Sequence, residues 1–215
     1  MKLKKIETPG TAHYAYVLAD GGEAAIVDPC RDVDQYLEAA RQMGARVRYV
    51  IETHRQEDFV MGSRAVRERT GAKIVNGTHE IMSHGDVHLD DGQHVTLGSL
   101  KIVARHTPGH TPESMCWIVY PDQHDKSAWA AFTGDTLFFG DTGRSDIPDQ
   151  SKAVENAGER RQTRQISLGL GCCFHRLLGF HQIGDGDGRA GILVDQIWQE
   201  PDARFGKDSA ILRDS

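Results

Sequence analysis

Three side chains that can bind a metal ion lie beside apolar segments of this 215-residue sequence. His54 follows one apolar run, His110 lies in a Thr-Pro-Gly-His-Thr turn, and Asp135 follows a second apolar run. Two imidazoles and one carboxylate form the ligand set typical of non-haem Fe(II), which leaves positions open for a substrate atom and O2. Zinc accepts the same ligands, with water in the fourth position. The sequence therefore predicts a metal site, with either ion as its occupant.

The first 75 residues are expected to alternate between strand and helix. Gly21-Gly22 separates two apolar runs and can take the positive φ of a tight turn, which predicts a β-hairpin. Apolar periodicity predicts these elements: strands at 14–18 and 24–27, a helix from Asp32 as N-cap to Gly44, a strand at 47–51, a helix at 59–70 ending at Gly71, and a strand at 73–75. Ligands in open α/β sheets gather at the carboxyl ends of strands, so His54 is expected at a binding edge.

The next segment predicts a second group of strands. Residues 95–97 and 100–104 flank Gly98-Ser99 as a hairpin, and 115–120 and 128–132 are typical of buried strands. The adjoining loops carry His110 and Asp135. From about residue 160, glycines interrupt every long helix, so 160–215 should be less regular and make fewer core contacts than 10–158.

Charge and hydropathy restrict the partners. The chain has 25 Lys and Arg against 31 Asp and Glu, a formal net charge of -6, with the two signs mixed. Nucleic-acid binders collect positive charge on one face, so we expect a small-molecule partner and no nucleic acid. No apolar run approaches the roughly 20 residues of a membrane span, which predicts a cytoplasmic protein without membrane association.

Three segments resemble, in order and spacing, the metal motifs of the metallo-β-lactamase superfamily: ETHRQEDF at 52–59, HTPGHT at 106–111 and FTGD at 132–135. Within it, VDPCRD at 27–32 and GRSD at 143–146 resemble segments of the persulfide dioxygenases and their rhodanese-fused relatives. The resemblance covers roughly residues 1–158 and implies an α/β fold, the αββα sandwich. Residues 159–215 are expected to be an incomplete or divergent tail that completes or flanks the same domain. Divergence and a shifted reading frame both explain the change.

The first metal motif departs from the superfamily. Its His-x-His-x-Asp-His stands here as His54-x-Gln56-x-Asp58-Phe59. Phe59 has no donor atom and Gln56 is a weak neutral ligand, so neither replaces a lost imidazole of a two-metal site. The mononuclear iron branch implies His54, His110 and Asp135 as ligands of one Fe(II) per chain, with zinc as the alternative. Phe59 is expected to fill the volume of the second metal.

Asp58 and Arg144 are the candidate catalytic residues that the resemblance implies. Asp58 would accept an imidazole N–H and fix the orientation of a ligand ring, or else it is an ordinary carboxylate at a helix start. Arg144 would pair with Asp146 beside the site and meet an anionic substrate. A surface ion pair is the alternative for these two residues.

Three functions remain open at this stage. The first is a mononuclear Fe(II) persulfide dioxygenase, which converts glutathione persulfide or a similar small persulfide and O2 to sulfite and thiol. The second is a thioester hydrolase like glyoxalase II, in which a metal activates water. The third is a non-catalytic remnant of the fold. The dioxygenase interpretation is compatible with a homodimer, and it assigns sulfur delivery to a separate rhodanese-type carrier, because the tail has no room for such a domain.

Overall fold

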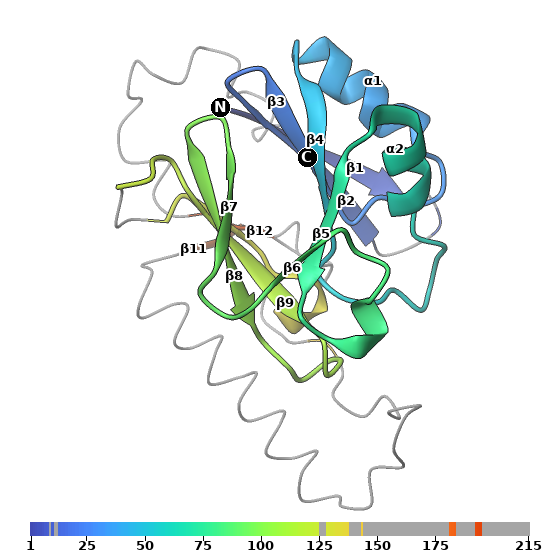
Figure 1. Cartoon of the computed structure of the whole chain (residues 1–215), viewed down its shortest axis with the longest axis vertical. Helices are drawn as coiled ribbons and strands as arrows, with labels where there is room; N and C mark the ends of the chain where they lie inside the picture. Colours follow the sequence, from blue (N-terminus) through green and yellow to red (C-terminus); the bar gives the residue numbers. More distant parts are fainter. Residues whose placement is uncertain are drawn as a thin grey trace, which may run out of the picture.

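The computed structural model describes residues 1–8, 10, 13–124, 128–137 and 143, and the backbone of 181–183 and 192–194. These residues form two six-stranded β-sheets that pack face to face (Figure 1). In the described part of the chain, no helix has the length and apolar character needed to cross a membrane.

The first sheet joins an antiparallel meander to a parallel half. Its strands, in spatial order, are β1 (Lys2–Thr8), β2 (His13–Asp20), β3 (Glu23–Val27), β4 (Arg46–Ile51), β5 (Lys73–Gly77) and β6 (Val87–Leu89). The β2–β3 hairpin turns at Gly21 and Gly22, whose φ values are 57° and 81°. Strands β3 to β6 run parallel, so their carboxyl ends lie along one edge of the sheet.

Both α-helices cover the outer face of the first sheet (Figure 1). Helix α1 (Asp34–Gln42) buries Tyr36 and helix α2 (Ser63–Thr70) buries Val66 against the outward side chains of β2 to β5. The opposite side chains of these strands face the second sheet, so the strands are buried on both faces. This explains their continuous apolar sequence.

The second sheet is antiparallel throughout. Its spatial order is β11 (His181–Ile183), β12 (Ile192–Val194), β10 (Ala130–Phe132), β9 (Met115–Tyr120), β8 (Leu100–His106) and β7 (His94–Leu97). Trp117 and Phe132 from this sheet belong to one apolar core between the sheets, together with Leu18 and Ile51 of the first sheet. Two short 3-10 helices, η1 (Glu80–Met82) and η2 (Gly134–Thr136), complete the described elements.

The tail contributes backbone to this second sheet. Leu193 of β12 pairs with Ala131 of β10, and β11 pairs with β12. Two short strands of the tail therefore extend the sandwich, although we expected little regular structure there. The other tail residues lie outside the described part, and the division into 1–158 and 159–215 stays a prediction.

Two helix starts differ from the sequence prediction. Helix α1 begins one residue after Val33, which is its N-cap in place of Asp32. Helix α2 begins at Ser63, four residues after the expected start at 59. The intervening backbone bonds instead to the segment after β3: Gly62 N–H donates to Pro29 O at 2.7 Å, and Met61 forms a β-bridge with Cys30. The segment before α2 is therefore a loop held against the first sheet.

Candidate metal centre

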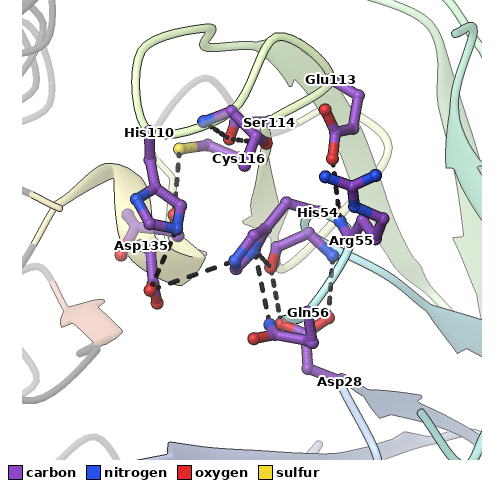
Figure 2. Close-up of polar contacts among 12 residues, drawn as sticks. Asp28, His54, Arg55, Gln56, His110, Glu113, Ser114, Cys116 and Asp135 are labelled. Atoms are coloured by element: carbon purple, nitrogen blue, oxygen red, sulfur yellow. Dashed lines mark hydrogen bonds and ion pairs between the residues drawn. The ribbon is translucent and has the colours of Figure 1, made fainter. Parts of the chain in front are cut away.

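The three predicted metal ligands converge at one edge of the sandwich (Figure 2). One ligand atom from each of His54, His110 and Asp135 lies within 4.8 Å of the others. Asp135 Oδ2 is 3.3 Å from His110 Nε2 and 4.0 Å from His54 Nε2. An ion bound at about 2.0–2.2 Å by each ligand would hold the donor atoms roughly 3–4 Å apart. The two separations from the Asp135 oxygen fall in this range.

Each ligand follows the end of a core strand. His54 lies three residues after Ile51, the last residue of β4. In between, Met115 N–H donates to Thr53 O at 2.7 Å and Trp117 Nε1–H donates to Glu52 O at 3.0 Å. These bonds tie the segment before His54 to the second sheet. His110 comes from the loop between β8 and β9, and Asp135 from η2 just after β10.

Gly134 permits the close approach of two ligand segments. Its φ is 48°, and a Cβ at this position would collide with the side chain of Thr53 and lie 3.3 Å from His54 Nδ1. A side chain here would therefore push η2, and with it Asp135, away from His54. This is a specific reason for glycine beside the carboxylate ligand.

A buried hydrogen-bond chain orients His54 (Figure 2). Asp28 accepts the Thr53 N–H at 2.8 Å and the Thr53 Oγ1–H at 2.7 Å. Because the hydroxyl proton of Thr53 points to Asp28, Thr53 Oγ1 accepts the Nδ1–H of His54, 2.9 Å away. We assign the proton of His54 to Nδ1 on this basis, which leaves the lone pair of Nε2 facing Asp135 and His110.

The electrostatics of the site suit a cation. Burial, together with the charge of His110, lowers the pKa of His54 to about 3, so this imidazole is neutral and able to bind a metal at pH 7. Burial raises the pKa of Asp135, the nearby charge of His110 opposes that shift, and the charge of Asp58 adds to it. A divalent cation at this place would offset the cost of burying the carboxylate.

The remaining predicted residues have different positions. Asp58 is exposed, and it influences the site through its charge. We expected it to accept the N–H of a ligand imidazole; for His54, Thr53 Oγ1 makes this contact. The catalytic role of Asp58 stays a prediction. Arg144 and Asp146 lie outside the described residues.

Gln56 and Phe59 stand in the positions of the lost histidines. Their side chains lie in different places. Gln56 Nε2 is 3.4 Å from His54 Nδ1, and Gln56 lines a small cavity beside Asp135. Phe59 packs on the ring of His13, with ring centroids 4.1 Å apart, and on the apolar cluster below the helices. We expected Phe59 to fill the volume of the second metal. Of these two residues, it is Gln56 that lines the space beside Asp135.

Sequence reasoning missed Asp28 and Thr53 as partners of the site. Asp28 has φ 48°, a conformation uncommon for residues other than glycine, and it directly follows β3. An acidic residue between a buried strand and a proline was the available signal. Nothing in the local sequence showed that this carboxylate would reach Thr53.

Comparison with known proteins places this geometry among related chains. The family description "Metallo-beta-lactamase superfamily" matches residues 8–170. A probable metallo-hydrolase of Burkholderia pseudomallei is 34% identical over 177 residues, with 65% of this chain and 60% of that protein covered. A hydroxyacylglutathione hydrolase of Anaeromyxobacter dehalogenans is 36% identical over 137 residues, covering 62% and 49%. The mitochondrial persulfide dioxygenase ETHE1 of Bos taurus is 29% identical over 153 residues, covering 67% and 56%.

Solved structures show the same architecture. A metallo-beta-lactamase from Staphylococcus aureus superposes with a TM-score of 0.68 at 26% identity, covering 78% of this chain and 51% of that chain. ETHE1 from Myxococcus xanthus superposes with a TM-score of 0.62 at 29% identity, covering 68% and 63%. The chain spans 49% to 60% of the length of the three curated relatives above.

Proposed function

Since the chain belongs to the metallo-β-lactamase superfamily, we propose that it is a persulfide dioxygenase with one Fe(II) held by His54, His110 and Asp135. Its substrate is glutathione persulfide or a similar small persulfide. The terminal sulfur is oxidised to sulfite, O2 is reduced, water supplies the third oxygen atom, and the thiol is released. Similarity to the persulfide dioxygenases ETHE1 supports this assignment.

The donor set is the observation that carries the proposal. Two imidazoles and one carboxylate converge, while Gln56 and Phe59 replace the imidazoles that would complete the superfamily's two-metal motif. A bound Fe(II) held by these three residues would have positions left for a substrate sulfur and O2. Two-metal hydrolysis depends on ligands that this motif has lost.

The residues of the chain hold and shield the site. Asp28 and Thr53 fix the ring of His54, and Gly134 lets Asp135 approach it. His54 is only 3% exposed, which keeps bulk water from its side of the site. These contacts would keep the ligand side chains oriented toward a bound ion.

A thioester hydrolase is the second candidate. The similarity to a hydroxyacylglutathione hydrolase, at 36% identity, favours it. In that case a metal ion lowers the pKa of bound water and the reaction consumes no O2. A hydrolase of this kind would have to work with the single ion that His54, His110 and Asp135 can hold, so the reaction itself is what separates the two candidates.

O2 uptake with glutathione persulfide tests the proposal. We expect uptake by anaerobically purified protein loaded with Fe(II), and at least a roughly hundredfold loss in His110→Ala, because two remaining ligands hold the ion too weakly. The control is His94→Ala, which removes an exposed imidazole from β7. Zinc-dependent cleavage of a glutathione thioester without O2 uptake would place the protein with the hydrolases. Inactivity in both assays, with iron bound and the fold intact by circular dichroism, would favour a non-catalytic remnant.

A further inference from the structure

A second cavity lies on the same edge of the sandwich as the metal centre. Its volume is about 100 Å3, enough for several water molecules or the end group of a small molecule. Its polar lining comes from the ends of four strands: His79 after β5, Asp90 and Asp91 after β6, His106 at the end of β8, and Glu113 before β9. None of these side chains takes part in the metal centre.

Glu113 is a buried carboxylate with one unused oxygen. The residue is 1% exposed, and its Oε1 accepts the backbone N–H of Arg55 at 3.2 Å. Among the described residues, its Oε2 has no hydrogen-bond partner. The guanidinium of Arg55 pairs with Glu57 Oε1, 2.6 Å away. Leaving a buried carboxylate oxygen without a donor is costly, so a donor from a bound molecule would be stabilising here.

The other charges of the lining leave the cavity acidic. Asp91 Oδ1 accepts the backbone N–H of His106 at 3.0 Å, and Asp91 Oδ2 lies 3.3 Å from Arg105 Nη1. The negative charge of Asp91 is therefore already paired with the arginine. Asp90 is exposed and has no ion pair within the described ranges. Glu113 and Asp90 are therefore the two carboxylates available to a cation.

His79 adds a donor for an anionic group. Its Nδ1 accepts the N–H of Ile81 at 3.3 Å, so a neutral His79 carries its proton on Nε2. The ring of His106 is already used, because its Nε2–H donates to Pro112 O at 2.9 Å. Two carboxylates and one ring N–H are complementary to an α-amino acid head group, which carries an ammonium and a carboxylate together.

The cavity is linked directly to the metal centre. Glu113 is three residues after His110 in the same loop, and the N–H that it accepts belongs to the residue after His54. In Figure 2, Glu113 lies next to Arg55, on the other side of His54 from Asp135. The cavity and the metal centre therefore border the same two segments, 54–55 and 110–113.

We propose that this cavity binds the ammonium of an amino-acid head group on the substrate's thiol carrier, with Glu113 Oε2 and Asp90 as acceptors. The inference rests on the proposed function, since it names the end of the persulfide that lies away from the metal. It selects thiols with a free ammonium, such as glutathione with its γ-glutamyl head, over thiols without one.

Binding of two unreactive probes tests this subsite without turnover. The probes are S-methylglutathione and its desamino analogue, in which hydrogen replaces the γ-glutamyl ammonium, titrated calorimetrically into the full-length, anaerobically purified protein. We expect S-methylglutathione to bind about tenfold more tightly or better, the value of a charge-assisted hydrogen bond. Glu113→Gln keeps an oxygen for the Arg55 N–H but removes the charge, so it should bring the ratio of the two affinities close to one.

Two further variants keep the test decisive. Asp90→Asn changes an exposed residue and should lower the same ratio even if Glu113→Gln fails to fold. Glu68→Gln, an exposed carboxylate on α2, should leave the ratio unchanged. Equal binding of the two probes, no binding of either, or a ratio that Glu113→Gln and Asp90→Asn leave intact would overturn the subsite. Loss of the proposed dioxygenase activity alone would not, because these affinities are measured with thioethers that have no terminal sulfur to oxidise.

Discussion

At the scale of single residues, the direction of one hydrogen bond determines whether His54 can bind a metal. Thr53 donates to Asp28 and accepts from His54 Nδ1–H, so the lone pair of Nε2 faces the site. Burial raises the pKa of Asp28 to about 7, while the two donors from Thr53 lower it. A cation in the site would further favour the ionised carboxylate. Metal binding and the ionisation of Asp28 therefore support each other.

Asp28→Asn should reverse the direction of the hydrogen bonds that link residue 28, Thr53 and His54. Asparagine tolerates the positive φ and keeps an oxygen for the Thr53 N–H, but its NH2 would donate to Thr53 Oγ1. The hydroxyl would then donate to His54 Nδ1 and move the ring proton to Nε2. We expect metal affinity to fall about ten- to hundredfold in a chelator competition. Thr53→Ser, which keeps the hydroxyl, is the control; unchanged affinity in Asp28→Asn, with 15N spectra showing His54 still protonated on Nδ1, would contradict the assignment.

At the scale of elements, the local sequence pattern predicted the strands and turns that depend on neighbouring residues alone. The strand at 115–120 and both glycine hairpins are confirmed, because a continuous apolar run and positive-φ glycines specify them without distant contacts. The convergence of His54, His110 and Asp135 was also predictable, since each residue follows a strand end. The start of α2 was not, because residues before Ser63 bond to the segment after β3, which is remote in sequence. The links from Asp28 to Thr53 and from Glu113 to Arg55 were hidden for the same reason.

The close approach at the start of α2 makes Gly62 sensitive to substitution. A Cβ there would collide with the Cys30 carbonyl oxygen and lie 2.8 Å from Val33 Cγ1. We expect Gly62→Ala to lower the free energy of unfolding by about 2–3 kcal/mol, measured by urea denaturation. Gly22→Ala, which meets no atom within 4 Å and suffers only from its φ of 81°, should cost about 1 kcal/mol. Equal costs for the two variants would show that the loop moves to accommodate the methyl group.

At the scale of the whole molecule, the candidate binding sites lie at one edge of the sandwich. The hydrogen bonds that join the two sheets through their hairpins lie at the opposite edge. The metal ligands and the acidic cavity lie where the parallel strands end, whereas the β2–β3 and β7–β8 hairpin tips meet at the other edge. There Asp20 Oδ2 accepts the N–H and Oγ–H of Ser99, each at 2.8 Å, and Glu23 Oε2 accepts the Gly98 N–H at 3.0 Å. These contacts fasten the two sheets without using any ligand residue.

Asp20→Ala should therefore weaken the fold and spare the metal site. It removes the acceptor for Ser99 and the partner of the Met1 ammonium, which is 2.9 Å from Asp20 Oδ1, so we expect a loss of about 1–2 kcal/mol at pH 7 with unchanged metal affinity. Burial tends to raise the pKa of Asp20, but hydrogen bonds from the Met1 ammonium and Ser99 outweigh it and hold the pKa below its ordinary value.

The pH dependence of this variant follows from the sign of that shift. A carboxyl whose pKa is lower in the folded state stabilises the fold above its unfolded pKa and loses that contribution as pH falls. The difference between wild type and Asp20→Ala should thus shrink below about pH 4 in urea denaturation series. A difference that grows on acidification, or a matching loss of metal affinity, would contradict this separation of the two edges.

The indole of Trp117 gives the metal centre an optical reporter. The ring is fully buried between the sheets, and its N–H is bonded to the carbonyl of Glu52, two residues before His54. Indole emission responds to the polarity and hydrogen bonding around the ring, so an ion that pulls His54 toward Asp135 acts on a fluorophore fixed to the same backbone. Titration of the native chain, without any attached dye, can thus follow occupancy of the site through this intrinsic signal, and Trp117→Phe identifies the part of the signal that comes from this ring.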